Sequence, residues 1–442
     1  MKRWFSSVIV VFLFATMGRT QTVYSNLFVV NGLGESVSRI DVSEDRVWNN
    51  VFTTDNVPQQ AKIQGDSLYI LNSISSTLQI IDLSSAKEVK KIDLGTQKNP
   101  WDFTFCKSAG KIFVSNLMAN SVSVVDVASG AVVDSIAVGR SPEGILAANG
   151  KVYVTNTAYN ASSYSYGQGT VYVIDAGTRT VVDSILTPTN PQNIVIGPNG
   201  RLHVVCTGNY GNVPGVVVVV NPGTNSMEDT IAVGGTPSSI TITSGGMAYL
   251  GAGGWMDYGH VLKYNAANGT VIRSDDHPIL TGKGAMGVLA DDAGHVFVAA
   301  FSDDQVDVID TSVDSVVLRY NVGDGPQNLA LWKTTVSSIN EDDLAQGAPV
   351  QFRLEQNYPN PVRARAIGSN ETQFVFQVPE EETISLKIYN LLGQEVLSLF
   401  QGKMSAGQHV FKADLAGLHT GLYFYQLRTN TGILTKKLIV AP

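Results

Sequence analysis

The sequence has few charged residues, cysteines and histidines for a chain of 442 residues. Charged residues make up 15% of it, against roughly 25% in an average soluble domain, which argues against coiled coils and charged disordered tails. The formal net charge is −8 and no basic cluster occurs, so we expect no nucleic-acid partner. Two cysteines and six histidines exclude a disulfide scaffold and leave little for a zinc, haem or iron–sulfur centre. We therefore predict no cofactor and no metal.

Long apolar runs are also scarce, and the one of interest lies at the N-terminus. Lys2 and Arg3 precede an apolar run over residues 8–15. This run is shorter than the roughly 20 residues that a membrane-spanning helix needs, and its position after basic residues is typical of a secretory signal peptide. An N-terminal membrane anchor or a buried strand is the alternative. We predict that residues 1–20 are a signal peptide, that the protein is exported to the outer-membrane surface or the medium, and that no transmembrane span remains.

Glycine is abundant, with 42 residues, and so are short β-type segments. An apolar strand that ends in Asp or Asn recurs along the chain, and successive ends differ by 41, 44, 49, 46, 44 and 45 residues. The seven ends are Asp41, Asp82, Asp126, Asp175, Asn221, Asn265 and Asp310. Repeats of this period in β-type sequence are typical of a β-propeller with one four-stranded blade per repeat.

Each repeat has the same internal order. A Gly-x-x-Pro turn precedes an inner strand such as 144–148, and a tight turn leads to a second strand at 151–156. The third and fourth strands follow at 170–175 and 180–185. The first repeat lacks an inner strand, while residues 326–332 have the inner-strand pattern with nothing after it, so we expect these ends to pair and close a ring. We predict an all-β chain in which residues 23–333 form a seven-bladed β-propeller.

The second strand carries a recognisable motif. Tyr153-Val154-Thr155-Asn156, with Val-Ile-Asp downstream, resembles the YVTN family of propeller repeats, and residues 113–116 and 28–31 are near variants. The resemblance implies a propeller fold. It does not imply one function, because the family includes surface-layer proteins and binding modules, and related propellers include lactonases and quinone-dependent dehydrogenases.

A second β domain follows the repeats. Residues 334–351, rich in Ser, Asp, Gln and Ala, are typical of a linker. We expect the strands of residues 352–442 to form a small antiparallel sandwich. The predicted strands are 372–378, 384–389, 395–399, 409–413, 421–428 and 434–440.

Four motifs in this domain, at 354–361, 388–396, 421–427 and 436–438, resemble the type A C-terminal sorting domain of type IX secretion cargo. The residues that carry the resemblance most clearly are Tyr358, Pro359, Asn360, Pro361, Gly393, Gly421, Tyr423, Lys436 and Lys437. The resemblance implies that residues 352–442 contact the type IX machinery and direct the chain across the outer membrane. An ordinary carbohydrate-binding or immunoglobulin-like sandwich is the alternative, and Val362 departs from the family, which usually has Phe there.

The polar residues of the repeats give no catalytic or metal motif. The strand-end aspartates are placed to accept hydrogen bonds from turn amides, whereas a calcium site needs several oxygens that converge on one point. His203 occupies the strand position of Tyr153 in the preceding repeat, so we predict a packed core ring. Cys106 and Cys206 end strands that run in opposite directions, so we predict two free thiols.

Aromatic residues gather in three consecutive long loops between second and third strands, at 157–169, 207–215 and 252–259. We expect these loops to emerge on the face where turns enter the inner strands, and we expect Trp101 and Glu143 to lie in those turns. The predicted ligand-binding residues are Trp101, Glu143, Tyr159, Tyr166, Tyr210, Trp255 and Tyr258. Exposed aromatic groups often mark interaction sites, although these loops could instead fold over their own blades.

The sequence therefore predicts a secreted or surface-presented binding module whose ligand is an extracellular polysaccharide or a surface protein, and not an enzyme. A lactonase-like hydrolase or a quinone-dependent dehydrogenase on the same scaffold is the first alternative. A passive structural surface protein is the second.

Overall fold

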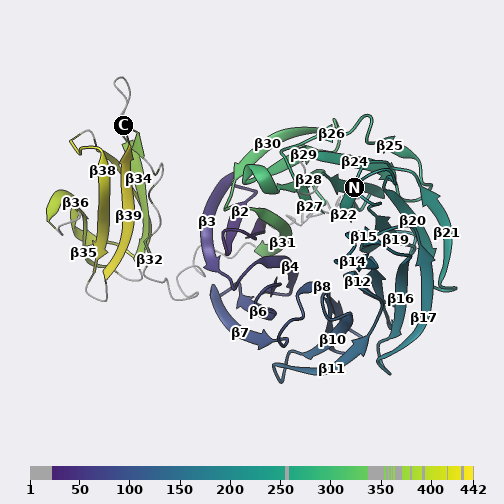
Figure 1. Cartoon of the computed structure of the whole chain (residues 1–442). Coiled ribbons are helices and arrows are strands. Elements are labelled where there is room, and N and C mark those ends of the chain that lie inside the picture. Colours follow the sequence, from purple (N-terminus) through teal and green to yellow (C-terminus); the bar gives the residue numbers. More distant parts are fainter. Residues whose placement is uncertain are drawn as a thin grey trace, which may run out of the picture. The chain divides into compact units, whose positions relative to one another are not determined.

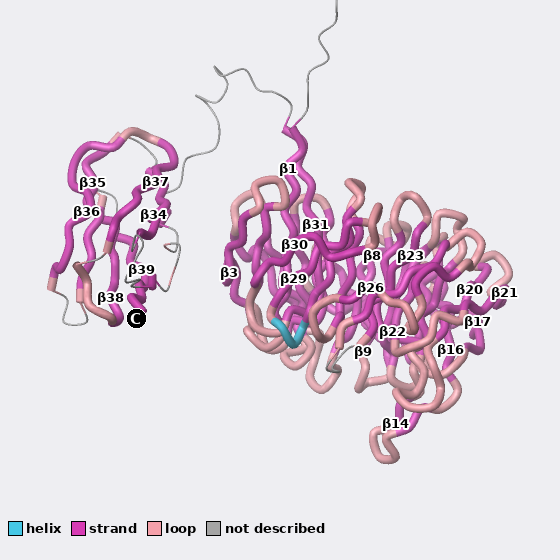
Figure 2. Tube along the Cα trace, turned by 90° about the horizontal axis from the view of Figure 1, so that it is seen from above, coloured by secondary structure: helices cyan, strands magenta, loops and turns pink. Residues whose placement is uncertain are grey.

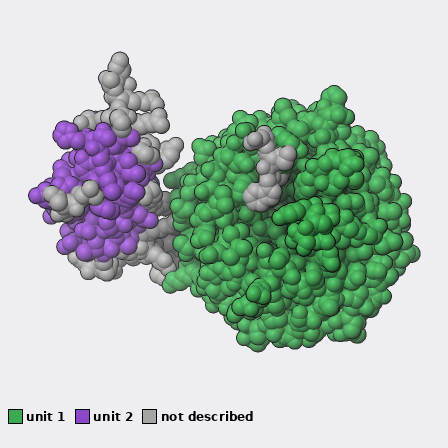
Figure 3. All heavy atoms as spheres, viewed as in Figure 1, with its two compact units in different colours: residues 1–337 green, residues 338–442 purple. Residues whose placement is uncertain are grey.

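The computed structural model divides the chain into two compact units, residues 1–337 and 338–442 (Figure 3). It describes residues 22–253, 258–336, 353–354, 357, 360, 362–363, 371–378, 381–390, 394–415, 417–429 and 433–441. The predicted signal peptide and residues 337–351 of the predicted linker lie outside the described residues. Within them, one short 3₁₀ helix, η1 (Phe301–Asp303), accompanies the strands, and no helix has the length and apolar character of a membrane span.

The first unit is a ring of antiparallel sheets around a common centre (Figure 1). In most of these sheets, strands that follow one another in the sequence also lie side by side. Two such sheets come first: β4 (Pro58–Gln64), β5 (Ser67–Asn72), β6 (Thr77–Asp82) and β7 (Lys87–Asp93), and then β8 (Pro100–Cys106), β9 (Lys111–Asn116), β10 (Ser121–Asp126) and β11 (Ala131–Ala137). Three more follow later in the chain: β18 (Pro191–Ile196), β19 (Leu202–Cys206), β20 (Val216–Asn221) and β21 (Ser226–Ile231); β22 (Pro237–Ile242), β23 (Met247–Ala252), β24 (His260–Asn265) and β25 (Val271–Arg273), with β26 (Ile279–Leu280) also paired with β24; and β27 (Ala285–Ala290), β28 (His295–Ala300), β29 (Gln305–Asp310) and β30 (Ser315–Asn321).

Two further sheets depart from this simple order. One contains β12 (Pro142–Ala148), β13 (Lys151–Asn156), β16 (Gly169–Asp175) and β17 (Thr180–Thr187), and its loop holds a small hairpin of β14 (Tyr159–Asn160) and β15 (Ser165–Tyr166). The other joins the two ends of the unit: β31 (Pro326–Val336) pairs with β1 (Thr22–Asn31), followed by β2 (Ser36–Asp41) and β3 (Arg46–Thr53).

The pairing of β31 with β1 closes the ring, as the sequence predicted. Leu27 lies opposite Leu331 and Phe28 opposite Ala330 in an antiparallel register. This pairing covers a strand edge that would otherwise expose its backbone amides and carbonyls. β31 continues to Val336, three residues past the predicted boundary at 333, because its extra residues pair with the start of β1.

Burial is greatest in the middle strands of each sheet and least in the outer strands. The second strand β13 is buried along nearly its whole length, whereas the outer strand β17 is mostly exposed. Neighbouring sheets cover both faces of a middle strand, so its sequence is almost continuously apolar. One core cluster shows this packing directly, because Phe113 and Val124 of one sheet pack with Val152 and Ile174 of the next.

Polar residues at the strand ends fix the turns and the third strands. Asp175 Oδ1 accepts backbone N–H bonds from Gly177 and Thr178 at 3.0 and 2.8 Å, so the predicted role of the repeated aspartates in turns is confirmed. The buried Asn116, which ends β9, donates from Nδ2 to Ser121 Oγ and Ser123 Oγ at 3.2 and 3.0 Å. This asparagine therefore ties the second strand to the third.

The second unit contains two sheets that share one core. The first has the order β32 (Arg353–Leu354), β34 (Glu371–Val378) and β37 (Gly407–Asp414). The second has the order β33 (Val362–Arg363), β39 (Ile433–Ala441), β38 (Gly421–Arg428), β35 (Glu382–Tyr389) and β36 (Glu395–Met404). Phe374 of the first sheet and Tyr425 of the second meet edge to face, with ring centroids 4.8 Å apart.

Two details of the second unit differ from the prediction. β33 runs parallel to β39, pairing Val362 with Val440, so the unit is not wholly antiparallel. β36 extends to Met404 instead of 399, because Gln401 to Met404 continue the pairing with β35.

Candidate functional site

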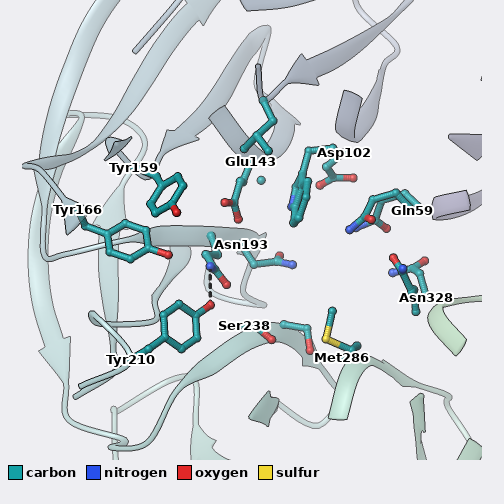
Figure 4. Close-up of a pocket in the computed structure, with 17 residues that line it drawn as sticks. Gln59, Asp102, Glu143, Tyr159, Tyr166, Asn193, Tyr210, Ser238, Met286 and Asn328 are labelled. Atoms are coloured by element: carbon teal, nitrogen blue, oxygen red, sulfur yellow. Dashed lines mark hydrogen bonds between the residues drawn. The ribbon is translucent and has the colours of Figure 1, made fainter. Parts of the chain in front are cut away.

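Among the described residues, a cavity of about 350 Å³ lies at the starts of the inner strands β4, β8, β12, β18, β22, β27 and β31 (Figure 4). Each of these strands has a register shift just after its first residue, which is proline in six strands and Ala285 in the seventh. A β-bulge of this kind inserts an extra residue and turns its side chain away from the regular pattern. The residues that follow the first residue all line the cavity: Gln59, Trp101, Glu143, Gln192, Ser238, Met286 and Gln327.

Glu143 is the most perturbed group of the cavity. Its side chain projects from the bulge of β12 (Figure 4), and the residue is only 7% exposed. Among the described residues, no side chain or backbone group forms a hydrogen bond or ion pair with its carboxylate. Burial raises the pKa of Glu143 to about 8, because a charged carboxylate loses its hydration there.

Close packing of the inner strands holds Glu143 in place. The following residue, Gly144, lies so near the neighbouring strand that a Cβ atom on it would be 2.8 Å from the carbonyl oxygen of Gln192. Ser115 Oγ donates to the backbone carbonyl of Glu143 from the preceding sheet, at 2.5 Å. The backbone at this bulge is therefore fixed from both sides.

The second carboxylate of the cavity, Asp102, is paired. Lys62 Nζ lies 2.7 Å from Asp102 Oδ1, and the backbone N–H of Phe103 donates to the same oxygen at 2.7 Å. The two acidic residues therefore differ in kind, because Asp102 has a cationic partner and Glu143 has none among the described residues.

Three tyrosines form one wall of the cavity (Figure 4). The centroids of Tyr159 and Tyr166 are 5.2 Å apart, and those of Tyr166 and Tyr210 are 6.3 Å apart. Their ring planes are inclined by 45° and 44°. Burial and then the charges of neighbouring groups, Glu143 among them, raise the pKa of Tyr166 and Tyr210.

Local backbone structure positions these rings. Tyr159 and Tyr166 lie opposite each other in the β14–β15 hairpin, which projects from one face of the ring (Figure 2). Tyr210 has a positive φ of 56°, and its loop is held by Asn209, whose Oδ1 accepts bonds from the N–H groups of Gly211 and Val213. Gln192 Nε2 donates to Tyr210 Oη at 3.0 Å and joins the wall to the inner strand.

Other parts of the cavity lining are polar. Ser238, Ser239 and Gln327 belong to them, and each has a buried side-chain oxygen without a hydrogen-bond partner in the structure. Asn193 and Asn328 add amide groups to the lining. Buried polar atoms are normally hydrogen-bonded, so these three oxygens are available to accept or share a hydrogen bond with water or with a polar group in the cavity.

Five of the seven predicted ligand-binding residues line this cavity: Trp101, Glu143, Tyr159, Tyr166 and Tyr210. Trp101 and Glu143 lie in the inner strands themselves, at the bulges, and not in the preceding turns as predicted. Tyr258 does not line the cavity; its ring packs 4.6 Å from that of His260, and its hydroxyl is 3.3 Å from Thr236 Oγ1. Trp255 lies outside the described residues.

The sequence predicted Trp101 and Glu143 but not the other residues that the inner strands contribute to the lining: Gln59, Gln192, Ser238, Met286 and Gln327. The signal was present as the residue after each repeated proline, which is polar or large where a regular inner strand would be apolar. These side chains reach the cavity because of the β-bulges at the strand starts, and the sequence pattern alone does not reveal a bulge.

The remaining sequence predictions concern buried groups. His203 is fully buried and its Nδ1 is 2.8 Å from Tyr264 Oη, so the predicted core ring is confirmed. Cys106 and Cys206 are buried and unpaired, as predicted. Within the described part of the chain, no group of three or more His, Cys, Asp and Glu is gathered as a metal site.

In the C-terminal unit, Asn360 holds the last strand. Its Oδ1 accepts the backbone N–H of Ile439 at 2.8 Å, and its Nδ2 donates to the carbonyl of Lys437 at 3.3 Å. Gly421 begins β38, and Tyr423 Oη donates to the carbonyl of His419 at 2.9 Å. Lys436 and Lys437 lie exposed on β39. The predicted sorting residues Tyr358, Pro359, Pro361 and Gly393 lie outside the described residues.

Solved structures with a similar fold include the hydrazine synthase of Kuenenia stuttgartiensis, with a TM-score of 0.53 and 17% identity over 64% of this chain and 95% of that one. Apo AztD from Citrobacter koseri matches with a TM-score of 0.46 and 12% identity, over 72% of this chain and 100% of that one. At 17% identity, the likeness to the hydrazine synthase bears on the fold alone. No curated protein matches the chain in sequence.

The C-terminal unit has a match of a different kind. Residues 356–441 match the family model described as "Secretion system C-terminal sorting domain". This match supports the type IX sorting domain that the four motifs predicted. The sorting domain marks the chain as cargo that is exported to the cell surface or secreted.

Proposed function

We propose that this protein is an exported ligand-binding module, in which a seven-bladed β-propeller of the YVTN type binds its ligand and a C-terminal β-sandwich directs export. Seven sheets of at least four strands in the described part of the first unit, closed by the β1–β31 pair, support the first part. Two sheets that share one core support the second.

The observation that carries the binding proposal is the buried carboxylate of Glu143, which has no protein partner among the described residues and points into an aromatic-walled cavity. Burying a carboxyl group without a partner costs stability. Proteins keep such groups mainly at functional sites, where a ligand uses them.

The shape and lining of the cavity favour the end of a polar ligand. A volume of about 350 Å³ lies near the lower end of the roughly 300–1,000 Å³ of small-molecule sites. Tyr159, Tyr166, Tyr210 and Trp101 offer ring faces, while Ser239 and Gln327 offer hydrogen-bonding groups. We propose an extracellular polysaccharide, or a segment of a surface protein, as the ligand.

An enzyme is the second candidate, and one observation favours it. A carboxylic acid whose pKa is about 8 remains protonated at neutral pH and is suited to general-acid catalysis. Hydrolysis of a bound glycan or lactone, lost on Glu143→Gln while binding persists, would favour this candidate over binding alone.

The binding proposal is tested with the full-length exported protein on an array of glycans and surface-protein fragments. We expect specific binding that falls about tenfold or more in Trp101→Ala/Tyr166→Ala, because each ring supplies contact area at the centre of the site. The matched control is Tyr164→Ala, which removes an 83% exposed ring from the tip of the same hairpin. Equal binding by the double variant would place the site elsewhere, and absence of binding by the unaltered protein would contradict the proposed function.

A further inference from the structure

The charges around the cavity favour a cation. Among the described residues that line it, Asp102 and Glu143 are acidic and none is Lys, Arg or His. The ion pair with Lys62 compensates Asp102. A ligand that brings a positive group would therefore give Glu143 the partner that the described residues do not supply, whereas an anionic ligand would repel the ionised form of Glu143 and find no cationic residue in the described lining.

The aromatic wall supports the same ligand chemistry. A cation binds an aromatic ring on its face, within about 6 Å of the centroid. Tyr159, Tyr166 and Tyr210 form a continuous series of rings beside Glu143 (Figure 4). Elsewhere in the chain, Arg39 covers Trp48 at 4.4 Å. Within the described residues, no Lys or Arg covers any of the three tyrosines or Trp101.

We propose that the cavity binds a protonated primary amine of the ligand, with the Glu143 carboxylate as its counter-ion and the rings of Trp101, Tyr159, Tyr166 and Tyr210 as a cage around it. This inference rests on the proposed binding function and names the group that is recognised. An amino sugar of a polysaccharide and a lysine side chain of a surface protein both carry this group.

Binding of an ammonium group is coupled to loss of a proton. Below its pKa of about 8, Glu143 is mostly protonated, and only its ionised form pairs with the ammonium group. The carboxyl proton passes to solvent, so the ligand remains a cation and Glu143 becomes an anion. The other titratable residues of the lining are Asp102, paired with Lys62, and the three tyrosines.

The expected pH dependence follows from the ionised fraction of Glu143. With a pKa of about 8, that fraction rises about 50-fold between pH 6 and pH 8. The affinity for an amine that stays protonated over this range, such as the lysine side chain with its pKa of about 10.4, should rise by the same factor, and calorimetry of that probe at pH 7 in buffers of different ionisation enthalpy should detect close to one proton released. An amino sugar should show a smaller rise, because its own amine loses a proton near neutral pH. Glu143→Gln should bind the amine about tenfold or more weakly at pH 8, because a charged hydrogen bond is lost, and its affinity should not depend on pH.

The experiment measures the affinity of the full-length protein for two matched pairs of probes by titration calorimetry. One pair is a glucosamine trimer and its fully N-acetylated counterpart. The other is Nα-acetyl-lysine amide and its Nε-acetylated form. Glu44→Gln, an exposed carboxylate on an outer turn, is the control for loss of one negative charge.

The inference would be supported by tighter binding of the free amine than of its acetylated form, with the pH dependence given above, and by loss of both effects in Glu143→Gln. The pair of probes that shows this preference identifies an amino sugar or a lysine as the source of the amine. Equal or tighter binding of the acetylated probes would overturn the inference and leave the binding function intact. If none of the probes and none of the ligands on the array bound the protein, both the amine inference and the proposed binding function would be overturned.

Discussion

Replacing Glu143 by glutamine should make the folded protein more stable at neutral pH. In the unfolded chain a glutamate loses its proton above a pKa of about 4.5, whereas in the folded protein the pKa of Glu143 is about 8. Between these values the folded state holds one proton more than the unfolded state, so stability falls as pH rises. Each pKa unit corresponds to about 1.4 kcal/mol. At pH 7 the interval of 2.5 units amounts to about 3 kcal/mol, and glutamine does not incur this cost.

Urea unfolding followed by tryptophan fluorescence measures this effect in the full chain. All five tryptophans precede residue 337, so the signal reports on the first unit and is blind to the sorting domain. We expect the difference in free energy of unfolding between Glu143→Gln and the unaltered protein to grow from pH 4.5 to pH 8 and then to level off. A difference that is independent of pH, or a variant that is less stable at pH 7, would refute the claim that Glu143 is buried without a partner.

Three further predictions follow from other buried groups. Burial lowers the pKa of His203 to about 4, so the unfolded state binds a proton more readily than the folded state. The free energy of unfolding should therefore fall by about 3 kcal/mol as pH falls from about 6.5 to 4. His203→Gln should remove this part of the pH dependence in the same unfolding assay. Cys106 and Cys206 should react with a thiol reagent only after unfolding, since both are buried and burial raises the pKa of Cys206 to about 12; a bridge between them in intact mass spectrometry would contradict the register. Asn360→Ala should destabilise the C-terminal unit by about 1–2 kcal/mol through loss of two hydrogen bonds to β39, visible as faster amide exchange at Ile439, with unchanged exchange in the first unit.

Much of the strand order could be predicted from the sequence because the repeats are explicit. Apolar strands that end in Asp or Asn recur at nearly constant spacing, and Asp175 and its counterparts fix each turn by local hydrogen bonds. Element ends were harder to predict. β31 reaches Val336 and β36 reaches Met404 because partner strands continue to pair with them, and such pairing is not visible in a single strand's composition.

The site could be predicted only in part. Tyr159, Tyr166 and Tyr210 were found because long loops with aromatic residues depart from the regular repeat. The burial of the Glu143 side chain could not be predicted, because it depends on a β-bulge and on the close approach of the neighbouring strand at Gly144. Tyr258 belongs to a loop of the same type but packs on its own blade, which no sequence pattern distinguishes.

The most direct test of the central claim is a crystal structure of the full-length protein with the tightest-binding probe. We expect the probe in the cavity at the start of the inner strands, with a polar atom within hydrogen-bond distance of the Glu143 carboxylate and contact with the ring of Tyr166. A probe bound on the outer strands, with the cavity holding only solvent, would contradict it.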